Sequence, residues 1–589
     1  QNVVQFLDDG FKLTTTNAGT NTSGGTYIYM AFADKPPGEI IDSLIDTPTN
    51  YDADSGNNGG NYCVFNPVSA DDSIYYTENG NLVTGNNSVS SSSSGSRGRI
   101  LSSIGFKTGK WYAEVQTTSA SDGDVDFAVG IFPVESTGYY STSGHYALRP
   151  TGHLYSPDGI HQSYGTGAWT NDDIIGIAVD MDSSTKTIQF FKNGTAIASA
   201  TTIVDNEYFF GYGSDGGGGS RAYKSTWNFG AAPFSYAPPS GHKSLCTQNL
   251  PDPTIADGST AMDAKTYSGT GSSNSITGLN FSPDFVWIKR RDTTSDHNLQ
   301  DIIRGTTSPL YSNLTNAEGN FSQGLTAFNS DGFTVGTGGD VNNSSGTYVA
   351  WAWDGGTSTA SNTDGGTTAS VRANPTAGFS IVAWSGHGSG STTIGHGLNA
   401  APELIILKGR DNAGAWVVGS DYIGWGDRLE LNTTSAKGSA SADFNSTAPT
   451  NSVFTVGSNQ GTGNKIAYCF APVAGYSAFG SYTGNGSSDG PFVFTGFKPA
   501  FLMFKRSDST GDWIIFDNER NTHEGNYREK VLYPNKNTAE ETSANGDTML
   551  FLSNGFKLNN VTFAYWNASG GTYVWAAFAS HPFKTARAA

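Results

Sequence analysis

The sequence predicts an all-β chain built from tandem β-sandwich modules, and composition, turn residues and internal repetition each support this. Aromatic residues make up 12% of the 589 residues and, with the many Thr, Val and Ile, favour strands. The 75 Gly and 22 Pro mark frequent turns. No segment sustains the i, i+3, i+4, i+7 spacing of apolar residues that indicates a helix.

The chain begins and ends on similar stretches. FLDDGFKLTTTNAGTNTSGGTYIYMAFADKP at 6–36 matches FLSNGFKLNNVTFAYWNASGGTYVWAAFASHP at 551–582. Such repetition indicates that a unit was duplicated. We therefore expect residues 1–36 to be the C-terminal half of a repeat module whose first half lies upstream or was lost.

Three longer copies of the unit follow. Each contains a Pro-led apolar strand with a Lys six residues on, namely PDFVWIK (283–289), PELIILK (402–408) and PAFLMFK (499–505). Each then has a block with Asn and Ala at fixed offsets, namely LYSNLTNAE (310–318), LELNTTSAK (429–437) and LYPNKNTAE (532–540). Strands separated by Gly, Asn and Ser turns predict a β-sandwich in each module.

These repeats and the polar segments between them predict the domain organisation. We expect a C-terminal half-module at 1–36, a linker at 37–61, an inserted domain at 62–250, a linker at 251–266, module 1 at 267–356, a linker at 357–377, module 2 at 378–475 and module 3 at 476–589.

The inserted domain has a strand pattern of its own. The stretch DIIGIAVDMDSSTKTIQFFKNG (173–194) predicts a hairpin of two apolar strands. The motifs WYAEV, SPDG, IIGIAVD and IQFFKNG, in this order within 98–238, resemble a SPRY domain. The resemblance implies a bent β-sandwich, inserted among the modules, that serves as a binding module and has no catalytic chemistry.

The order of the segments carries a wider resemblance. The half-module, IIDSLIDTPTNYDADSGNNGGNYCVFNPV, the SPRY-like domain, SLCTQNLPDPTIADG and the repeats with GFKPAFLMFKR look like tail fibre proteins of marine bacteriophages. This implies a structural protein of the virion, located in the tail fibre of the extracellular particle. Its partners would be a host cell-surface glycan or protein and other virion tail proteins. Analogy with phage fibres implies a homotrimer, but the resemblance brings no established binding residues.

Charge and hydropathy exclude two classes of partner. The formal net charge is -19 and no basic patch stands out, which argues against a nucleic-acid groove. No apolar run of 18 residues occurs, so we expect no membrane insertion. Cys63 and Cys246 flank the inserted domain and could form a disulfide, but the sequence cannot fix their geometry.

The sequence predicts no enzyme, no cofactor and no metal site. The G-x-S-x-G string at 486–490 precedes a strand and lacks the following helix of a nucleophile elbow. The nine His show no zinc-ligand spacing. Calcium loops are not favoured, because the ligand pattern of EF-hands is incomplete at Asp52, Asp54, Asp122, Asp124 and Asp126.

Two modules share an Asp-x-x-Arg spacing, Asp301 with Arg304 and Asp517 with Arg520. Glycosidase carboxylates would also meet through the fold, so a catalytic reading is possible. A repeated structural ion pair is the favoured interpretation.

Ligand contacts are expected from aromatic residues on loops of the inserted domain. An aromatic ring can cover a sugar face while neutral neighbours bind its hydroxyls, and loops on a rigid sandwich are common contact surfaces. The alternative is that these rings are packed loop anchors. The candidates are Tyr139, Tyr140, Tyr146, Tyr164, Trp169 and Tyr223.

A rival surface lies in module 3, where VTFAYWNASGG replaces the polar loop of the opening copy. Phe563, Tyr565 and Trp566 would form a distal tip or pack between chains of an oligomer. The function expected overall is receptor binding during host attachment. A structural spacer or capsid-decorating fibre and, third, a polysaccharide depolymerase remain open.

Overall fold

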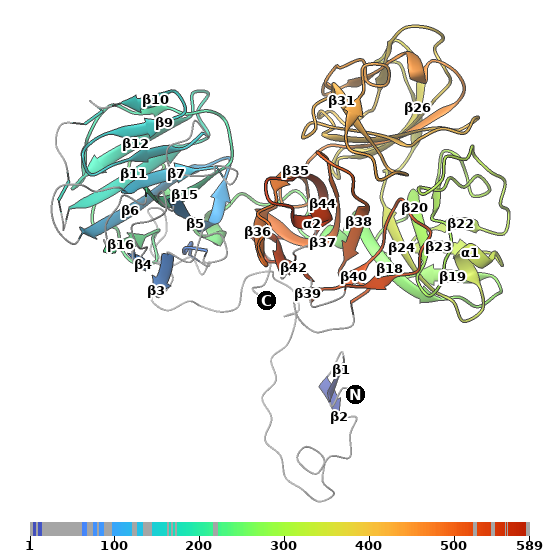
Figure 1. Cartoon of the computed structure of the whole chain (residues 1–589), viewed down its shortest axis with the longest axis horizontal. Coiled ribbons are helices and arrows are strands. Elements are labelled where there is room, and N and C mark those ends of the chain that lie inside the picture. Colours follow the sequence, from blue (N-terminus) through green and yellow to red (C-terminus); the bar gives the residue numbers. More distant parts are fainter. Residues whose placement is uncertain are drawn as a thin grey trace, which may run out of the picture. The chain divides into compact units, whose positions relative to one another are not determined.

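The computed structural model describes residues 4–7, 10–13, 62–66, 75–78, 82–86, 97–119, 127–133, 144–161, 164–165, 169–170, 173–215, 222–521, 527–543, 548–559, 561 and 564–584. Across these residues the chain is almost entirely β-structure, which confirms the predicted fold class (Figure 1). It divides into two compact units, Gln1–Ile41 and Asp42–Ala589. Within the described residues, no helix has the length and apolar character needed to cross a membrane.

The first unit contains a hairpin of β1 (Val4–Leu7) and β2 (Gly10–Leu13), in which Phe6 pairs with Phe11. Module 3 contains the matching hairpin of β42 (Thr548–Leu552) and β43 (Gly555–Asn559), in which Phe551 pairs with Phe556. The strands on either side of the turn therefore pair in the same register in both copies.

In the second unit, the inserted domain is a sandwich of two antiparallel sheets around one apolar core. The first sheet has the order β10-β9-β8-β7-β15-β5. Its strands are β5 (Arg97–Phe106), β7 (Phe127–Phe132), β8 (Tyr146–Leu148), β9 (Leu154–Ser156), β10 (Gly159–His161) and β15 (Tyr208–Asp215).

The second sheet has the order β13-β12-β11-β6-β16-β4-β3, with β14 on β12 and β17 on β6. Its strands are β3 (Tyr75–Glu78), β4 (Leu82–Asn86), β6 (Lys110–Ser119), β11 (Ile174–Asp180), β12 (Thr187–Lys192), β13 (Thr195–Ala196), β14 (Thr201–Thr202), β16 (Ala222–Asn228) and β17 (Lys243–Ser244), and the 3-10 turn η2 (Thr247–Asn249) follows.

The hairpin predicted at 173–194 is confirmed, because β11 and β12 pair with Asp180 opposite Thr187. The disulfide weighed for Cys63 does not form. Cys63 is a buried free thiol, and burial raises its pKa to about 11. It therefore contributes to the core as a small apolar side chain.

Module 1 pairs the sheet β18-β24-β20-β21 with the sheet β19-β23-β22. Its elements are η3 (Gly258–Thr260), β18 (Met262–Ser268), β19 (Asn274–Thr277), β20 (Phe285–Arg290), β21 (Asn298–Asp301), β22 (Leu325–Asn329), β23 (Gly332–Val335), α1 (Gly339–Asn342) and β24 (Thr347–Trp353).

Module 2 pairs the sheet β25-β26-β27-β34-β29-β30-β31-β32 with the two strands β28 and β33. Its elements are β25 (Thr359–Asn362), β26 (Ala369–Asn374), β27 (Phe379–Trp384), β28 (Thr392–Gly395), β29 (Leu404–Gly409), β30 (Val417–Ser420), β31 (Asp427–Glu430), β32 (Gly438–Ser439), β33 (Val453–Val456), η4 (Ser458–Gln460) and β34 (Lys465–Phe470).

Module 3 pairs the sheet β35-β44-β37-β38 with the sheet β36-β43-β42-β39 and adds the pair β40-β41. Its further elements are β35 (Ser477–Thr483), β36 (Asp489–Phe494), β37 (Phe497–Arg506), β38 (Trp513–Asp517), β39 (Tyr527–Arg528), β40 (Lys530–Val531), β41 (Glu541–Thr542), α2 (Ala564–Asn567) and β44 (Thr572–Pro582).

The segment 357–377, expected to be a linker, contains two strands. β25 and β26 extend the large sheet of module 2 by pairing onto β27. Ala369 and Val371 bury their side chains in the core of this module. The high Ser, Thr and Gly content of this segment is typical of a linker. Composition therefore did not reveal the short alternating stretch SVRAN, which lies in β26.

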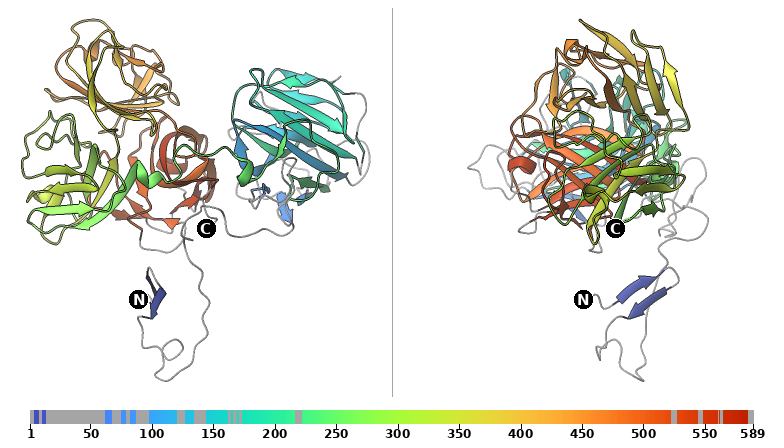
Figure 2. Two further views of the ribbon diagram at one scale, coloured as in Figure 1. Left: turned by 180° about the vertical axis from the view of Figure 1, so that it is seen from behind. Right: turned by 90° about the vertical axis from the view of Figure 1, so that its right-hand side faces the viewer.

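The three modules contact one another in a closed cycle, which we call the module ring (Figures 1 and 2). We name its contacts seam A, where module 1 meets module 3, seam B, where module 2 meets module 1, and seam C, where module 3 meets module 2. The Lys that ends each Pro-led strand crosses one seam, and all three side chains are fully buried. The contacts are Lys289 Nζ to Asn537 O at 3.4 Å (seam A), Lys408 Nζ to Thr315 O at 2.9 Å (seam B) and Lys505 Nζ to Thr434 O at 3.1 Å (seam C).

A ring N–H next to each seam makes a second repeated contact with a backbone carbonyl of the neighbouring module. The three bonds are His297 Nε2 to Tyr533 O at 3.0 Å, Trp416 Nε1 to Tyr311 O at 2.8 Å and Trp513 Nε1 to Glu430 O at 2.9 Å. Because a carbonyl only accepts, His297 carries its proton on Nε2, and its Nδ1 accepts from Trp287 at 2.8 Å. Burial holds the pKa of His297 well below its usual value, so this imidazole is neutral.

The Asn repeated in the segments 310–318, 429–437 and 532–540 holds these rings in place. Its side-chain oxygen accepts from the backbone N–H of the seam residue within its own module. The pairs are Asn313 with His297 at 3.0 Å, Asn432 with Trp416 at 2.8 Å and Asn535 with Trp513 at 2.9 Å. The fixed offset seen in the sequence thus has a structural cause.

Charged pairs distinguish seams A and B from seam C. Arg291 contacts Glu540 at 2.8 Å across seam A, and Arg410 contacts Glu318 across seam B. On seam C the backbone bond is kept, from Lys437 N–H to the carbonyl of Ser507 at 2.9 Å, but Ser507 replaces the Arg. Seam C has lost both members of the pair together.

The Asp-x-x-Arg pairs are buried structural ion pairs, as favoured from the sequence. Asp301 binds Arg304 at 2.5 Å and also accepts from Tyr468 across seam B at 2.9 Å. Asp517 binds Arg520 at 2.6 Å and accepts from Trp351 across seam A. Both pairs have side chains with no exposed surface, so they fasten the seams from inside.

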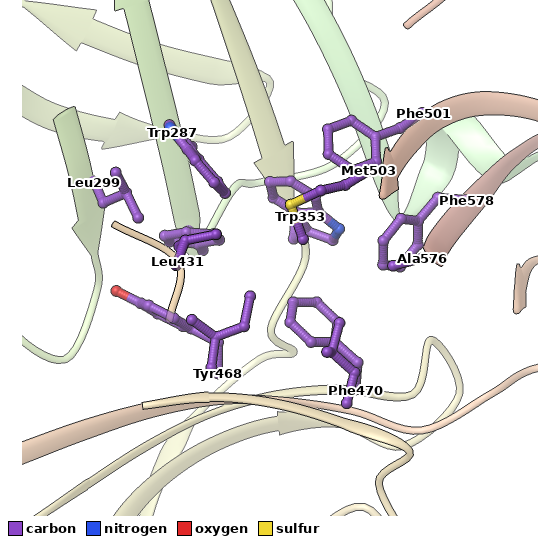
Figure 3. Close-up of a pocket in the computed structure, with 13 residues that line it drawn as sticks. Trp287, Leu299, Trp353, Leu431, Tyr468, Phe470, Phe501, Met503, Ala576 and Phe578 are labelled. Carbon is purple, nitrogen blue, oxygen red and sulfur yellow. The ribbon is translucent and has the colours of Figure 1, made fainter. Parts of the chain in front are cut away.

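The inward faces of the three modules form one continuous apolar core. A cavity of about 20 Å³ lies where they meet (Figure 3). Trp353, Phe470 and Phe578 point into it from the last strands of modules 1, 2 and 3. Ala576 also lines it, at the position filled by the larger rings of Trp351 and Tyr468 in the other modules.

Candidate functional site

The structure places two of the predicted loop aromatics in the core of the inserted domain. Tyr146 and Trp169 are each 4% exposed. The Tyr146 hydroxyl accepts from the backbone N–H of Val204 at 3.1 Å. These rings are packed anchors and cannot cover a sugar without rearrangement. Burial in the apolar core is favoured over exposure for such large rings. Tyr139 and Tyr140 lie outside the described residues.

Tyr164 is half-buried, and its ring meets Phe190 edge-on at 6.1 Å. Its hydroxyl donates to Ser199 O at 3.4 Å. Tyr223 lies in β16, and its side chain is outside the described residues. Ligand binding by Tyr164 and Tyr223 stays a prediction.

The aromatic loop of module 3 does not form an exposed tip at Trp566. This ring is 2% exposed and lies in α2, edge-on to Phe504 at 6.1 Å and to Phe516 at 5.4 Å. Tyr565 is half-buried against the same core, and Phe563 lies outside the described residues. α2 therefore closes the end of the module with its apolar side chains.

The exposed feature of the inserted domain is the β9–β10 hairpin at the edge of the first sheet. All three residues of β10 are exposed, and Ile160 is 49% exposed. The SPDG motif forms the turn, in which Gly159 has a φ of +130° that few other residues adopt. The hairpin thus presents an apolar side chain on a strand at the edge of the sheet.

Three polar side chains gather on the same hairpin. Ser156 Oγ lies 3.0 Å from His161 Nε2, which is 3.3 Å from Asp158 Oδ1, and Ser156 also donates to Asp158. These hydrogen bonds, the one from Ser156 first, hold the pKa of Asp158 below its usual value. The group offers hydrogen-bonding atoms on the face of the hairpin opposite to Ile160, because successive side chains of a strand alternate between the two faces.

This cluster lacks the geometry of a hydrolytic triad. In a triad the carboxylate and the nucleophile bind different nitrogens of the imidazole. Here Asp158 and Ser156 share Nε2 of His161. The cluster is therefore suited to binding hydroxyl or amide groups rather than to activating Ser156.

Sequence reasoning missed this hairpin, because it searched for aromatic rings alone. The available signal was the SPDG turn followed by the apolar Ile160 in an otherwise polar stretch. Nearby, the Arg149 guanidinium lies 5.1 Å from the Tyr155 ring centroid, and Tyr164 N–H donates to His161 O at 3.3 Å. These contacts fix the segments on both sides of the hairpin.

Of the calcium loops and the G-x-S-x-G string considered in the sequence, only the string lies in the described parts of the chain. Asp52, Asp54, Asp122, Asp124 and Asp126 lie outside them. No group of three His, Cys, Asp or Glu able to hold a metal occurs among the described residues. The G-x-S-x-G string forms the turn before β36, with Asn485 Nδ2 donating to Asp489 O at 2.8 Å, and no helix follows it.

One family model matches the chain, and its description is a domain of unknown function, DUF7483, over residues 1–36 and 257–582. No curated protein is significantly similar in sequence. Among solved structures, the SPRY domain of human HERC1 is 23% identical, with 28% of this chain and 96% of that chain covered and a TM-score of 0.22. The TRIM65 PSpry domain is 13% identical, with 28% and 93% covered and a TM-score of 0.21. The carbohydrate-binding module CBM66 from Bacillus subtilis is 10% identical, with 29% and 93% covered and a TM-score of 0.20.

Proposed function

The chain belongs to the DUF7483 family, and on that premise we propose that it is a structural protein of a bacteriophage tail fibre that attaches the virion to the host cell surface. The module ring, which holds most of the family match, would be the rigid body. The inserted SPRY-like sandwich would make the contact with a surface glycan or protein. The chain would act by binding and without catalysis.

The observation that carries this proposal is the β9–β10 hairpin. Ile160 offers an apolar side chain on one face of the hairpin, and Ser156, Asp158 and His161 offer hydrogen-bonding groups on the other. Sugars and polar peptides require this combination. The ring, by contrast, uses its inward faces and its buried lysines to hold itself together.

The test is retention on purified surface polysaccharide of marine bacteria, with the full chain and its variants. We expect Ile160→Asp combined with His161→Ala to lose retention while keeping the melting temperature. Val204→Asp is the matched control, because Val204 is also apolar and 58% exposed in the same domain but lies outside the hairpin.

The size of the polysaccharide after incubation separates the other candidates. Retention without shortening supports attachment, shortening supports a depolymerase, and neither outcome leaves a spacer or capsid-decorating fibre. Labelled antibody on phage particles locates the chain, and a label on the capsid would contradict the tail-fibre assignment.

A further inference from the structure

The three modules allow a comparison within one chain at one end of their sandwiches. Three neighbouring strands carry one residue each in the same register there, and we call these residues the end triplet. The triplets are Tyr267, Tyr348 and Arg290 in module 1, Tyr482, Tyr573 and Arg506 in module 3, and Trp384, Lys465 and Gly409 in module 2. Module 2 differs at all three positions.

In modules 1 and 3 the triplet closes the sandwich. Tyr267 stacks on Tyr348 at 5.0 Å, and the hydroxyl of Tyr267 donates to Val341 O at 2.7 Å. Tyr482 stacks on Tyr573 at 4.7 Å, and the hydroxyl of Tyr573 donates to Ala564 O. The polar atoms of both ring pairs are thus bound to the short helices α1 and α2.

In module 2 the corresponding donors are unsatisfied. Trp384 is 4% exposed, and its buried Nε1 has no hydrogen-bond partner. Lys465 is 8% exposed, and within the described chain its Nζ makes neither a hydrogen bond nor an ion pair. Trp353 and Trp575 also have a buried Nε1 without a hydrogen-bond partner, so the unpaired ammonium of Lys465 is the feature that distinguishes this end of module 2.

The end of module 2 is also closed by different elements from its counterparts. The 3-10 turn η4 stands where the other modules have α1 and α2. Gly409 replaces the Arg, whose guanidinium in module 1 lies 6.0 Å from the Tyr348 ring centroid. A Cβ on Gly409 would lie 3.4 Å from Lys465 Nζ, so the absent side chain leaves room beside the ammonium.

The carboxylates near Lys465 indicate which kind of ligand this end of module 2 favours. The exposed Asp411 accepts from the backbone N–H of Asn464 at 2.6 Å and from its side chain at 3.1 Å. Asp443 is fully engaged by Gln460, Asn459 and Arg428. One free cation with one solvent-facing carboxylate favours a neutral ligand with several hydroxyls over an anion, because Asp411 would repel an anion.

We propose that this end of module 2 binds a neutral saccharide, with Lys465 Nζ donating to hydroxyl oxygens and Asp411 accepting from a hydroxyl. The site rests on the proposed function, because it would give the fibre a second glycan contact outside the inserted domain. It is distinct from the β9–β10 hairpin in sequence and chemistry.

The test is saturation-transfer NMR on the full chain with glucose, galactose, mannose and N-acetylglucosamine as probes. We expect transfer to at least one sugar, reduced at least about tenfold in affinity by Lys465→Met, since a charged donor is lost. Lys437→Met is the matched control, because Lys437 is 42% exposed in the same module. No transfer to any of the four sugars, or transfer unchanged by Lys465→Met, would overturn the proposal.

Thermal unfolding supplies a second readout. Removing an unpaired buried charge should raise the melting temperature or leave it unchanged, whereas a fall of more than about 2 °C would make Lys465 structural and overturn the site. The two proposals also fail separately. Retention of polysaccharide without monosaccharide transfer removes only this site, and transfer lost in Lys465→Met without retention on any polysaccharide removes only the attachment function.

Discussion

At the scale of residues, buried charges in the module ring work as sets that span a seam. Asp301 binds Arg304 in its own module and Tyr468 in the next. On seam C the corresponding positions are Ser420, Ile423 and Ala576, so acceptor, cation and donor are absent together. This joint replacement is expected, because one member alone would be a buried group without its partner.

The seam B set predicts a large difference between a single and a double variant. Asp301→Ser leaves Arg304 buried without its carboxylate and should lower the free energy of unfolding by about 3–5 kcal/mol. Asp301→Ser with Arg304→Ile copies the residues of module 2 and should lose clearly less. Urea unfolding measures both, and equal losses would show that the charge pairing does not matter.

The three seam lysines predict a pH dependence. Burial lowers the pKa of Lys289, Lys408 and Lys505 to about 8, from 10.5 in an exposed lysine. Between these values the folded chain binds fewer protons than the unfolded chain, so stability rises with pH from about 8 to 10.5 and is lost as pH falls through 8. Each lysine adds a slope of up to about 1.4 kcal/mol per pH unit.

Melting temperatures at successive pH values between 7 and about 10 measure this slope. Lys408→Met should flatten it by one lysine's share, and the exposed Lys437→Met should not. Above pH 10 the buried tyrosines oppose the rise, because burial raises the pKa of Tyr468 and the unfolded chain then loses more protons. A melting temperature that falls steadily from pH 8 would contradict the assignment.

At the scale of elements, a buried Asn ties an end loop to its module in modules 1 and 3. Asn567 is fully buried and accepts from Asn485 N–H at 2.8 Å. It donates to Ser487 O at 2.8 Å and to Val561 O at 3.1 Å. Asn342 does the same in module 1, accepting from Thr270 N–H at 2.8 Å.

Removing this amide should loosen one element and spare the ring. Asn567→Ala leaves several backbone groups unpaired and should cost about 2–3 kcal/mol. Hydrogen exchange should speed up in the loop 484–490, with β37 and β44 unchanged. The exposed Asn412→Ala is the control, and equal exchange in both variants would argue against the tie.

Local patterns in the sequence were enough to predict the strands and the repeats, because alternation and turns are short-range signals. They also located Lys289 and Asn313, but not their roles. Lys289 bonds to a residue almost 250 positions away, a contact that no local spacing reveals. The burial of Trp169 and Trp566 was equally out of reach, since packing decides which aromatic ring is exposed.

At the scale of the molecule, one chain supplies all three members of a threefold arrangement. Every seam is occupied by a contact within the chain. The homotrimer expected from analogy with phage fibres stays a prediction, and it would have to use surfaces other than these seams.

This arrangement predicts stability that is independent of concentration. Assemblies held between chains melt at lower temperature on dilution, whereas contacts within a chain do not. The melting temperature of the module ring should therefore stay constant over a roughly hundredfold dilution. A downward shift on dilution would show that the seams form between chains.

The unequal seams have a consequence for how such a protein can change. In a homotrimer one gene encodes all three interfaces, so any substitution appears three times and symmetry is enforced. Here different segments of one chain encode each interface, so seam C can lack the charged pair that seams A and B retain. In the same way, module 2 lacks the stacked Tyr pair that modules 1 and 3 retain. Because the three copies are covalently linked, the sequence of one module can change while the contacts of the other modules still hold the ring together.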